Sequence, residues 1–532
     1  MQRYFNTEGR CKPDIHYMVG LDERMDRIKR LFVDRGKYFV INRGRQYGKT
    51  TTLMALAEYL KDNYTVIFMD FQMMSTASFA DEQTFVIAFI EYIEELLAVK
   101  KELRKAVDVQ AMLDLKTLKN AGRISMAHLF RKLSRICGTS KKPVVLMIDE
   151  VDRASNNQVF LDFLAMLRRY YLDREDNPSF YSVILTGVYD IKNLKLKLRP
   201  EEEHKYNSPW NIAANFDMDM SFSSEEIAGM LKEYEEDHHT GMDMKAVSQW
   251  IYEYTSGYPY LVSAICKLID EEPYRIKKFR SLEEAWTKEG IGEAVNILLT
   301  QQIPLFQSMI RQLNDYSDLK RMLNAILLQG KRITFNPDNS AINLAFMFGY
   351  IVNGKGSVQV ANRIFEMRLY NLFLSEEELT NAMYNEAQRD RNQFIQNRRL
   401  DMKLILEKFV LHFSDVYSEQ DEKFVEEYGR KFFLLYLKPI INGTGNYYIE
   451  AQTRDARRTD IIVDYLGQQF IVELKIWHGN EYNEKGRQQL AEYLDFYHQN
   501  EGYLLSFNFN KKKEQGVKEF RIGEKTIIEA IV

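Results

Sequence analysis

The sequence has few of the residues that mark secreted, fibrous or membrane-spanning chains. Only three of its 532 residues are cysteine, and Cys11, Cys137 and Cys266 lie too far apart for a disulfide framework or a cysteine-rich zinc site. Its 10 prolines and 26 glycines exclude long fibrous or low-complexity tracts. No run approaches the roughly 18–20 apolar residues of a membrane span, and the amino-terminal segment lacks a signal-peptide core. We therefore predict a soluble, cytoplasmic protein.

The chain also lacks a strong excess of one charge. Lysine and arginine total 72 and aspartate and glutamate total 76, which gives a net charge of −4. This excludes a uniformly basic chain that coats nucleic acid by charge alone, although a local basic groove remains compatible with it. Hydrophobic residues make up 45% of the chain, as in ordinary globular proteins. At about 150 residues per domain, the length predicts three to four domains.

Short apolar runs in the first part of the chain predict a parallel β-sheet. They are separated by helix-length segments, the pattern expected when helices cover both faces of such a sheet. The longest separation, between the second and third runs, predicts a helical insert. The runs are Lys37–Asn42, Tyr64–Phe71, Pro143–Asp149, Phe180–Thr186 and, as a candidate fifth strand, Phe216–Phe222.

The rest of the chain predicts four further segments. Capping boxes at Ser223–Glu226, Ser281–Glu284 and Ser375–Glu378 predict helix starts, and a hairpin is expected around Asn353–Gly356. Helices followed by such a hairpin suggest a winged-helix module. The predicted organisation is an α/β domain at 1–215, a small helical domain at 216–300, a winged-helix module at 301–374, a helical linker at 375–408 and a second α/β domain at 409–532.

The turn after the first strand has the pattern of a phosphate-binding loop. It reads Gly44-Arg-Gln-Tyr-Gly48-Lys49-Thr50, which keeps the second half of GxxxxGK[ST], whereas Arg43 stands at the first glycine position. Backbone N–H groups of such a loop cradle phosphates, its lysine neutralises them, and its hydroxyl ligates Mg²⁺. The alternative is a chance Gly-Lys-Thr turn. The predicted nucleotide contacts are Gly44, Arg45, Gln46, Tyr47, Gly48, Lys49, Thr50 and Thr51.

The third strand supports this interpretation. It ends in Asp149-Glu150, where the aspartate can hold a Mg²⁺ shell and the glutamate can polarise the attacking water. The alternative is a pair of solvent-facing acids. Thr186, at the end of the fourth strand, is either a sensor of the γ-phosphate or a turn residue. Arg153 and Arg199 are candidate arginine fingers or ordinary surface arginines.

The segment Tyr38–Leu53, with its Arg-Gln-Tyr-Gly-Lys-Thr loop, resembles bacterial AAA-like, STAND-type ATPases, which often lack the first loop glycine. Thr255-Ser-Gly-Tyr-Pro259 resembles the GxP motif of the family's helical lid. The resemblance implies a P-loop fold with a helical lid and a winged helix, ATP as ligand with Pro259 close to it, and a switch whose nucleotide state controls an attached effector.

The final segment carries a second constellation. Arg458–Tyr465 and Gln469–Lys475 read as the two strands of a hairpin that turns at Gly467. Alternate residues of a strand share a face, so Glu473 and Lys475 project together, and the hairpin brings Asp460 level with them. Two carboxylates suit Mg²⁺ or Mn²⁺, and a metal there can activate water against a phosphodiester, with Lys475 positioning or deprotonating that water.

This pattern resembles the D…ExK signature of PD-(D/E)XK nucleases. Gln489 and Tyr493 resemble the QxxxY motif of the RecB-like branch, and Glu427, chosen over Glu426, is expected as an additional upstream carboxylate. The resemblance implies a mixed four-stranded sheet flanked by helices. The alternative is a surface hairpin of alternating charge, in which D…ExK is common by chance.

Together the motifs predict an ATP-controlled, metal-dependent nuclease, acting on DNA more readily than on RNA, with a role in defence or mobile-element control by analogy. A homo-oligomer is compatible with the sequence. One alternative is a switch whose nuclease-like domain only binds nucleic acid or a protein. Another is an ATPase that reads DNA through its winged helix. The basic stretch Arg389–Lys403 is expected to be a solvated linker helix, with nucleic-acid contact as its alternative.

Overall fold

The computed structural model describes residues 3–119, 124–188, 210–271, 279–376, 378, 381–416, 422–441, 444–449, 461–477, 480–508 and 514–532. The chain divides into two compact units, Met1–Ser221 and Phe222–Val532. Within the described residues, no helix combines the length and the apolar character needed to cross a membrane.

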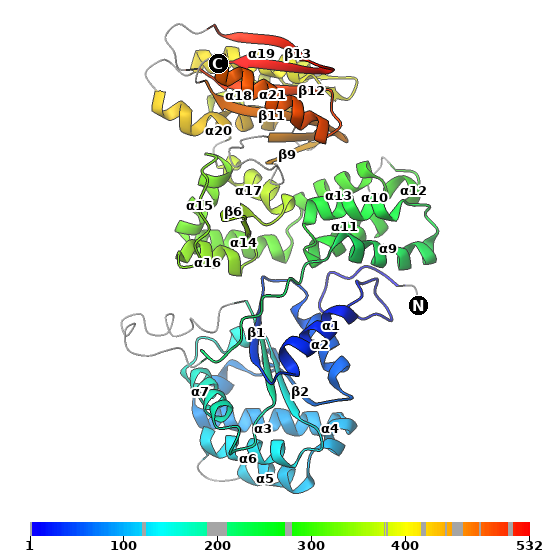
Figure 1. Cartoon of the computed structure of the whole chain (residues 1–532), viewed down its shortest axis with the longest axis vertical. Coiled ribbons are helices and arrows are strands. Elements are labelled where there is room, and N and C mark those ends of the chain that lie inside the picture. Colours follow the sequence, from blue (N-terminus) through cyan, green and yellow to red (C-terminus); the bar gives the residue numbers. More distant parts are fainter. Residues whose placement is uncertain are drawn as a thin grey trace. The chain divides into compact units, whose positions relative to one another are not determined.

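A parallel sheet forms the centre of the first unit (Figure 1). Its strands follow the order β1-β4-β3-β2, and the four predicted strands are confirmed. Every residue of β3 and β4 is buried, as expected for strands covered on both faces. The bounds are β1 (Tyr38–Asn42), β2 (Thr65–Asp70), β3 (Val144–Asp149) and β4 (Ser182–Gly187).

Helices pack on both faces of this sheet. Successive residues of β1 point to opposite faces, so Tyr38 belongs to one hydrophobic cluster and Phe39 to the other. The Phe39 face is covered by α1 (Asp22–Ile28) and α2 (Lys49–Leu60). The helices on the Tyr38 face include the predicted insert between β2 and β3. They are α3 (Glu82–Val99), α4 (Lys101–Ala106), α5 (Val109–Lys119), α6 (Met126–Thr139) and α7 (Gln158–Leu172).

The prediction of a fifth strand at Phe216–Phe222 is wrong. An isolated parallel bridge joins Ala214 to Phe39, but no strand is formed over the predicted segment. Phe216, Met218 and Met220 are nevertheless buried against the core. The alternating pattern therefore reflects real burial of an extended segment, without the ladder of backbone hydrogen bonds that defines a strand.

The second unit begins with helices. The capping box at Ser223–Glu226 is confirmed, and Ser281 caps the short α12 through the Glu284 N–H. The predicted break falls between α10 and α11, where Gly257 has φ 71° and its Cα approaches the Phe222 carbonyl too closely for a Cβ. The helices are α9 (Ser224–His238), α10 (Met244–Thr255), α11 (Pro259–Glu271), α12 (Leu282–Ala285) and α13 (Lys288–Thr300).

Further helices and a hairpin follow in the second unit. The hairpin predicted around Asn353–Gly356 is confirmed, with Lys355 and Gly356 at positive φ in its turn. The description of this segment as a winged-helix module stays a prediction. Its elements are α14 (Pro304–Asp315), α15 (Ser317–Leu327), α16 (Ser340–Met347), β5 (Ile351–Gly354), β6 (Ser357–Val360) and α17 (Arg363–Ser375).

The linker prediction needs two corrections. Ser375 ends α17 and donates its hydroxyl to the Leu372 carbonyl, so it does not cap a new helix. The basic stretch Arg389–Lys403 is not one helix, because a small hairpin interrupts it. The elements are α18 (Ala382–Asp390), β7 (Ile395–Gln396), β8 (Arg399–Leu400) and α19 (Met402–Val416). Asn397 and Arg398 both take positive φ in the hairpin turn, a local conformation that the charge pattern does not reveal.

The carboxy-terminal sheet is larger than the four strands expected. Among the described residues it has six strands in the order β13-β14-β12-β11-β10-β9, with parallel and antiparallel pairs (Figure 1). Helices α20 (Glu422–Ile441) and α21 (Asn480–Phe496) accompany it. The strands are β9 (Gly445–Ile449), β10 (Ile461–Tyr465), β11 (Gln468–Ile476), β12 (Glu501–Phe507), β13 (Gly516–Ile522) and β14 (Lys525–Ile531).

Candidate functional sites

The predicted phosphate loop connects β1 to the first turn of α2. The side chain of Lys49 is 7% exposed, and its Nζ donates to the carbonyls of Arg43 at 3.0 Å and Gly44 at 2.9 Å. Gly48 has φ 75°, a left-handed conformation that glycine adopts without strain. The loop thus holds one buried ammonium at a helix start, where both the charge and the backbone dipole favour an anion.

The arginine at the first glycine position has a structural role. The Arg43 guanidinium donates to the carbonyls of Met218 at 2.6 Å and Phe216 at 3.2 Å, and its Cζ lies 5.6 Å from the centroid of the Phe216 ring. These contacts attach the start of the loop to the extended segment that was predicted as a fifth strand. The departure from the usual glycine therefore adds an anchor to the loop.

The second predicted motif lies at the end of β3. Asp149 is 1% exposed, and it accepts hydrogen bonds from the Thr186 hydroxyl and, at 2.9 Å, from the Glu150 N–H. Glu150 adopts φ 54°, which is uncommon for a non-glycine residue and is a feature that clusters at functional sites. The structure therefore brings Asp149, Glu150 and Thr186 together at one edge of the sheet.

Electrostatics couple this edge to the loop. Burial raises the pKa of Glu150, and the Lys49 ammonium opposes that rise. Burial lowers the pKa of Lys49, and Glu150, Asp152 and Asp149 oppose that fall. Lys49 follows the carboxyl end of β1 and Asp149 ends β3, so in this parallel sheet the ammonium and the carboxylates lie at the same edge.

Sequence reasoning missed Asp70 as a member of this group. Asp70 ends β2 directly opposite Asp149 in the parallel register, and its carboxylate accepts the Gln72 N–H at 2.8 Å. Burial raises the pKa of Asp70. Its position at the carboxyl end of the second apolar run was the signal that could have revealed it, because such ends meet at one edge of a parallel sheet.

The other residues predicted at this site do not all lie in the first unit. The Tyr47 hydroxyl lies 2.6 Å from the Ser221 hydroxyl, and the Thr51 hydroxyl accepts the Cys11 N–H at 3.1 Å. Arg45 lies in the loop, and Arg153 lies in the short 3₁₀ turn after Glu150. Pro259 belongs to the second unit, where it begins α11, and Arg199 lies outside the described residues.

These groups fit a nucleotide with its magnesium ion. Lys49 supplies a buried cation, and the Thr50 hydroxyl and the Asp149 carboxylate are oxygen ligands of the kind that Mg²⁺ prefers. In the described part of the chain, the buried Oε1 of Gln46 has no hydrogen-bond partner, so the loop retains an unused acceptor.

The second candidate site lies on β11. Lys475 Nζ is 2.8 Å from Glu473 Oε1 and donates to Gln489 Oε1 at 3.1 Å. The side chains of Glu473 and Lys475 are 12% and 14% exposed. Gln489 is on α21, so the strand and the helix meet at the Lys475 ammonium. The sequence predicts that Glu473 and Lys475 project together, but it does not predict the contact with Gln489.

Of the other residues predicted at the nuclease site, the structure describes the side chain of Tyr493 but not those of Glu427 and Asp460. Tyr493 lies one turn after Gln489 on α21 and is buried, with its ring 5.0 Å from that of Tyr497. Glu427 lies in α20, but its side chain is outside the description, and Asp460 lies outside the described residues altogether. No group of three or more histidine, cysteine or acidic side chains suited to a metal occurs among the described residues. Glu473 provides a carboxylate oxygen that fits Mg²⁺ or Mn²⁺.

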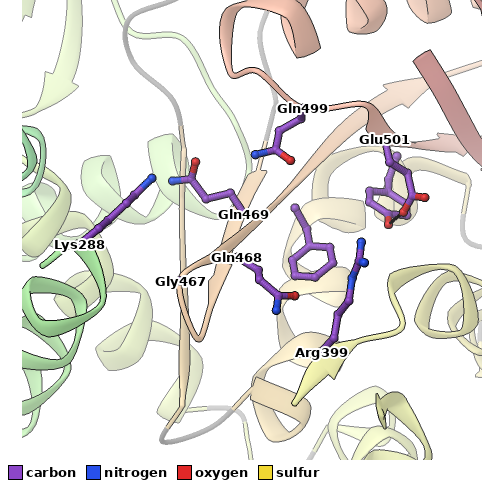
Figure 2. A pocket seen from close by; sticks show the side chains of 9 residues that line it. Lys288, Arg399, Gly467, Gln468, Gln469, Gln499 and Glu501 are labelled. Atoms are coloured by element: carbon purple, nitrogen blue, oxygen red, sulfur yellow. Dashed lines mark hydrogen bonds between the residues drawn. The ribbon is translucent and has the colours of Figure 1, made fainter. Parts of the chain in front are cut away.

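A polar pocket of about 350 Å³ lies at the turn of the β10–β11 hairpin (Figure 2). Figure 2 shows Lys288 and Arg399 approaching the hairpin from different sides. The pocket involves the first residues of β11, whereas Lys475 is near the end of that strand. It is therefore separate from the candidate nuclease residues. Its lining is Lys288, Arg399, Gly467, Gln468, Gln469, Phe470, Gln499, Glu501 and Tyr503.

The fold and sites define a P-loop ATPase-type unit followed by a nuclease-type α/β domain. Comparison with family models agrees. Residues 9–375 match the AAA-like domain and residues 446–520 match the PD-(D/E)XK nuclease superfamily. The first match covers more than half of the chain, so this protein belongs to the AAA-like domain family, and it carries a PD-(D/E)XK domain at its carboxy-terminal end.

Solved structures give more distant similarities. The Walker-type ATPase PABY2304 of Pyrococcus abyssi is 12% identical, with 69% of this chain and 99% of that chain covered and a TM-score of 0.48. The Aeropyrum pernix ORC1 protein in complex with DNA is 13% identical, with 68% of this chain and 94% of that chain covered and a TM-score of 0.31. The Thermotoga maritima RuvB Holliday junction branch migration motor is 12% identical, with 64% of this chain and 92% of that chain covered and a TM-score of 0.31. No curated protein sequence matches the chain.

Proposed function

We propose that this protein is an ATP-binding and ATP-hydrolysing switch that controls a Mg²⁺- or Mn²⁺-dependent nuclease. The observation that carries the proposal is the hydrogen bond from Lys475 Nζ to Gln489 Oε1 at 3.1 Å, which joins the ExK strand to the QxxxY helix. The AAA-like and PD-(D/E)XK family matches support the pairing of the two activities.

In the first unit, each motif residue has a distinct task. Lys49 neutralises phosphate charge, and Asp149 with Thr50 would hold the magnesium ion, which supplies charge stabilisation at the transferred phosphoryl group when it is bound. Glu150 orients and polarises the attacking water, and its raised pKa suits a group that receives a proton. Thr186 orients Asp149 through its hydroxyl hydrogen bond.

In the nuclease domain, Glu473 and Asp460 would hold the divalent ion, which supplies water activation and charge stabilisation when it is bound. Lys475 positions the attacking water and stabilises negative charge on the scissile phosphate. Gln489 holds the ammonium in place because its Oε1 accepts a hydrogen bond from Lys475 Nζ. The products of one cleavage step would be two nucleic-acid ends, one of which carries the phosphate.

The substrate in this proposal is nucleic acid, with DNA favoured over RNA. ATP is the controlling ligand, and the segment between the two sites, predicted to be a helical lid and a winged helix, transmits the nucleotide state. A homo-oligomer and a role in defence or in control of mobile elements are parts of the same proposal. The role in defence is proposed by analogy with the family.

The test is cleavage of plasmid, single-stranded DNA and RNA with Mg²⁺ or Mn²⁺, with and without ATP. We expect Asp460→Ala and Glu473→Gln to abolish cleavage, and Lys49→Ala to change its dependence on ATP. Glu514→Gln is the matched control, because Glu514 makes an exposed ion pair with Lys518. Cleavage that survives both Asp460→Ala and Glu473→Gln would refute the proposed site.

A second candidate function is a switch whose nuclease-like domain binds nucleic acid without cutting it. It is favoured by the Glu473–Lys475 ion pair, which neutralises the one motif carboxylate that the structure describes. Binding of nucleic acid without cleavage in every metal and nucleotide condition would select this alternative over the first.

A further inference from the structure

A buried carboxylate lies behind the candidate nuclease residues. Glu529 of β14 is 0% exposed. Its Oε1 accepts hydrogen bonds from Asn483 Nδ2 at 2.5 Å and Ser506 Oγ at 3.1 Å, and its Oε2 accepts Arg487 Nε at 2.8 Å. A buried carboxylate is stable only when it is paired and hydrogen-bonded, and these three donors satisfy that requirement.

Arg487 is itself held in a fixed position. Its Cζ lies 3.7 Å from the centroid of the Phe520 ring of β13, and Nη1 donates to Glu484 at 2.7 Å. The guanidinium therefore stacks on one strand while it bonds to the carboxylate of the next strand. A planar guanidinium with several donors can do both, which a lysine cannot.

The network lies on the same face of the sheet as the candidate nuclease residues. In the parallel register, Glu473 pairs with Leu504 and Leu504 pairs with Glu529, so Glu473 and Glu529 project to one face. Lys475 pairs with Ser506 in the same register. The carboxylate of Glu529 and the pair Glu473–Lys475 thus belong to one polar layer under α21.

Helix α21 connects the two groups. Asn483 and Arg487 are one turn apart and both donate hydrogen bonds to Glu529. On the same helix, Gly486 faces Lys475, and Gln489 accepts a hydrogen bond from the Lys475 ammonium. A Cβ on Gly486 would stand 2.7 Å from Lys475 Nζ, so the helix backbone rests directly over the ammonium. The hydrogen bonds from α21 to Glu529 therefore fix the position of this helix relative to Lys475.

We propose that Arg487 and Glu529 are positioning residues of the nuclease site, which fix α21 so that Gly486 and Gln489 hold the Lys475 ammonium beside Glu473. The inference rests on the proposed nuclease function. Glu529 is not a further metal ligand, because its two oxygens already accept three donors, one of them cationic.

The first test measures Lys475 directly and needs no cleavage. The full-length chain is labelled briefly with acetic anhydride, and the rate at Lys475 is read by mass spectrometry relative to the exposed Lys116. We expect Arg487→Met to raise the Lys475 rate by roughly three- to tenfold, the change expected for loss of about one net hydrogen bond. Asp495→Asn is the control, since it removes an exposed ion pair with Lys525 from the same helix.

The second test is a double-mutant cycle on cleavage with Arg487→Met and Gln489→Ala. If Arg487 acts through the contact between Gln489 and Lys475, the double variant cleaves about as slowly as the slower single variant. Independent effects that multiply would show that Arg487 only stabilises the fold. Arg487→Lys, which keeps a cation for Glu529, is expected to recover part of the lost rate.

The outcomes separate this inference from the proposed function. An unchanged Lys475 labelling rate in folded Arg487→Met overturns the positioning role, whether or not the wild-type chain cleaves nucleic acid. A raised labelling rate in a wild-type background that never cleaves supports the positioning role and counts against the nuclease function. Folding is checked by circular dichroism, and Glu529→Gln provides a second variant if Arg487→Met fails to fold.

Discussion

The Tyr254 hydroxyl donates a hydrogen bond of 3.2 Å to Oδ2 of Asp464, which joins α10 to β10 within the second unit. Arg363, at the start of α17, lies near the same carboxylate, with its Cζ 4.3 Å from the centroid of the Tyr448 ring of β9. Residues from the predicted lid and winged helix therefore meet the nuclease sheet in one polar cluster.

The first prediction concerns the pH dependence of this cluster. Burial raises the pKa of Asp464, although Arg363 opposes the rise. A folded-state pKa above the unfolded value of about 4 means that the stability from this group is present at low pH and is lost as pH rises through the folded pKa. We expect Asp464→Asn to gain stability relative to the wild type as pH rises, in thermal unfolding followed from pH 4 to 8.

The control for that series is Asp495→Asn, which removes a carboxylate that is 72% exposed. Tyr254→Phe should lower the stability of the second unit by about 0.5–1.5 kcal/mol, because it removes one hydrogen-bond donor from a half-buried carboxylate. A constant difference between Asp464→Asn and the wild type across the pH range would contradict the prediction.

The second prediction concerns the arginine that replaces the first loop glycine. Arg43→Gly restores the usual motif, but it removes two hydrogen bonds to the Phe216 and Met218 carbonyls. We expect a loss of about 1–3 kcal/mol in the unfolding free energy of the first unit and weaker ATP binding, measured by chemical denaturation and calorimetry. Arg43→Lys keeps one donor group, so its unfolding free energy should lie between those of the wild type and Arg43→Gly. Equal stability of Arg43→Gly and the wild type would show that the anchor is unimportant.

The third prediction separates ATP binding from hydrolysis. Glu150→Gln keeps the size of the side chain but cannot accept a proton, so hydrolysis should fall by about 10²–10⁴-fold while ATP affinity changes little. Steady-state phosphate release and equilibrium binding measure the two quantities. Glu175→Gln, in the exposed segment after α7, is the control. Full hydrolysis by Glu150→Gln would assign the base elsewhere, with Asp70 as the nearest carboxyl-bearing candidate on the adjacent strand.

The fourth prediction uses the contact between Gly486 and Lys475. In Gly486→Ala the new Cβ would stand 2.7 Å from Lys475 Nζ, so the flexible lysine must move away from Glu473 and Gln489. Helix propensity alone favours alanine by about 1 kcal/mol, so we expect cleavage to fall without a loss of thermal stability. Gly229→Ala, in α9 with open space around it, is the matched control. Reduced stability together with reduced cleavage would indicate a packing defect instead.

Some of the fold could be read from local patterns. The four strands of the first sheet are continuous apolar runs, and the hairpin at Asn353–Gly356 has turn residues that specify it. The two motifs are also local, because Lys49 follows its loop directly and Glu473 and Lys475 share one strand face. Where the pattern was ambiguous the prediction failed: Phe216–Phe222 alternates like a strand but has no ladder, and Ser375 ends a helix although its sequence resembles a cap.

The sequence by itself determined the residue chemistry: a loop lysine, strand-end acids, and an ExK strand followed by a QxxxY helix. Tertiary structure decided which of these groups meet. The contacts of Asp464 with Tyr254 and of Glu529 with Arg487 join residues 210 and 42 positions apart, and no local periodicity encodes them. Such pairings arise because buried polar groups must find partners during packing, and the available partners depend on how distant elements come together.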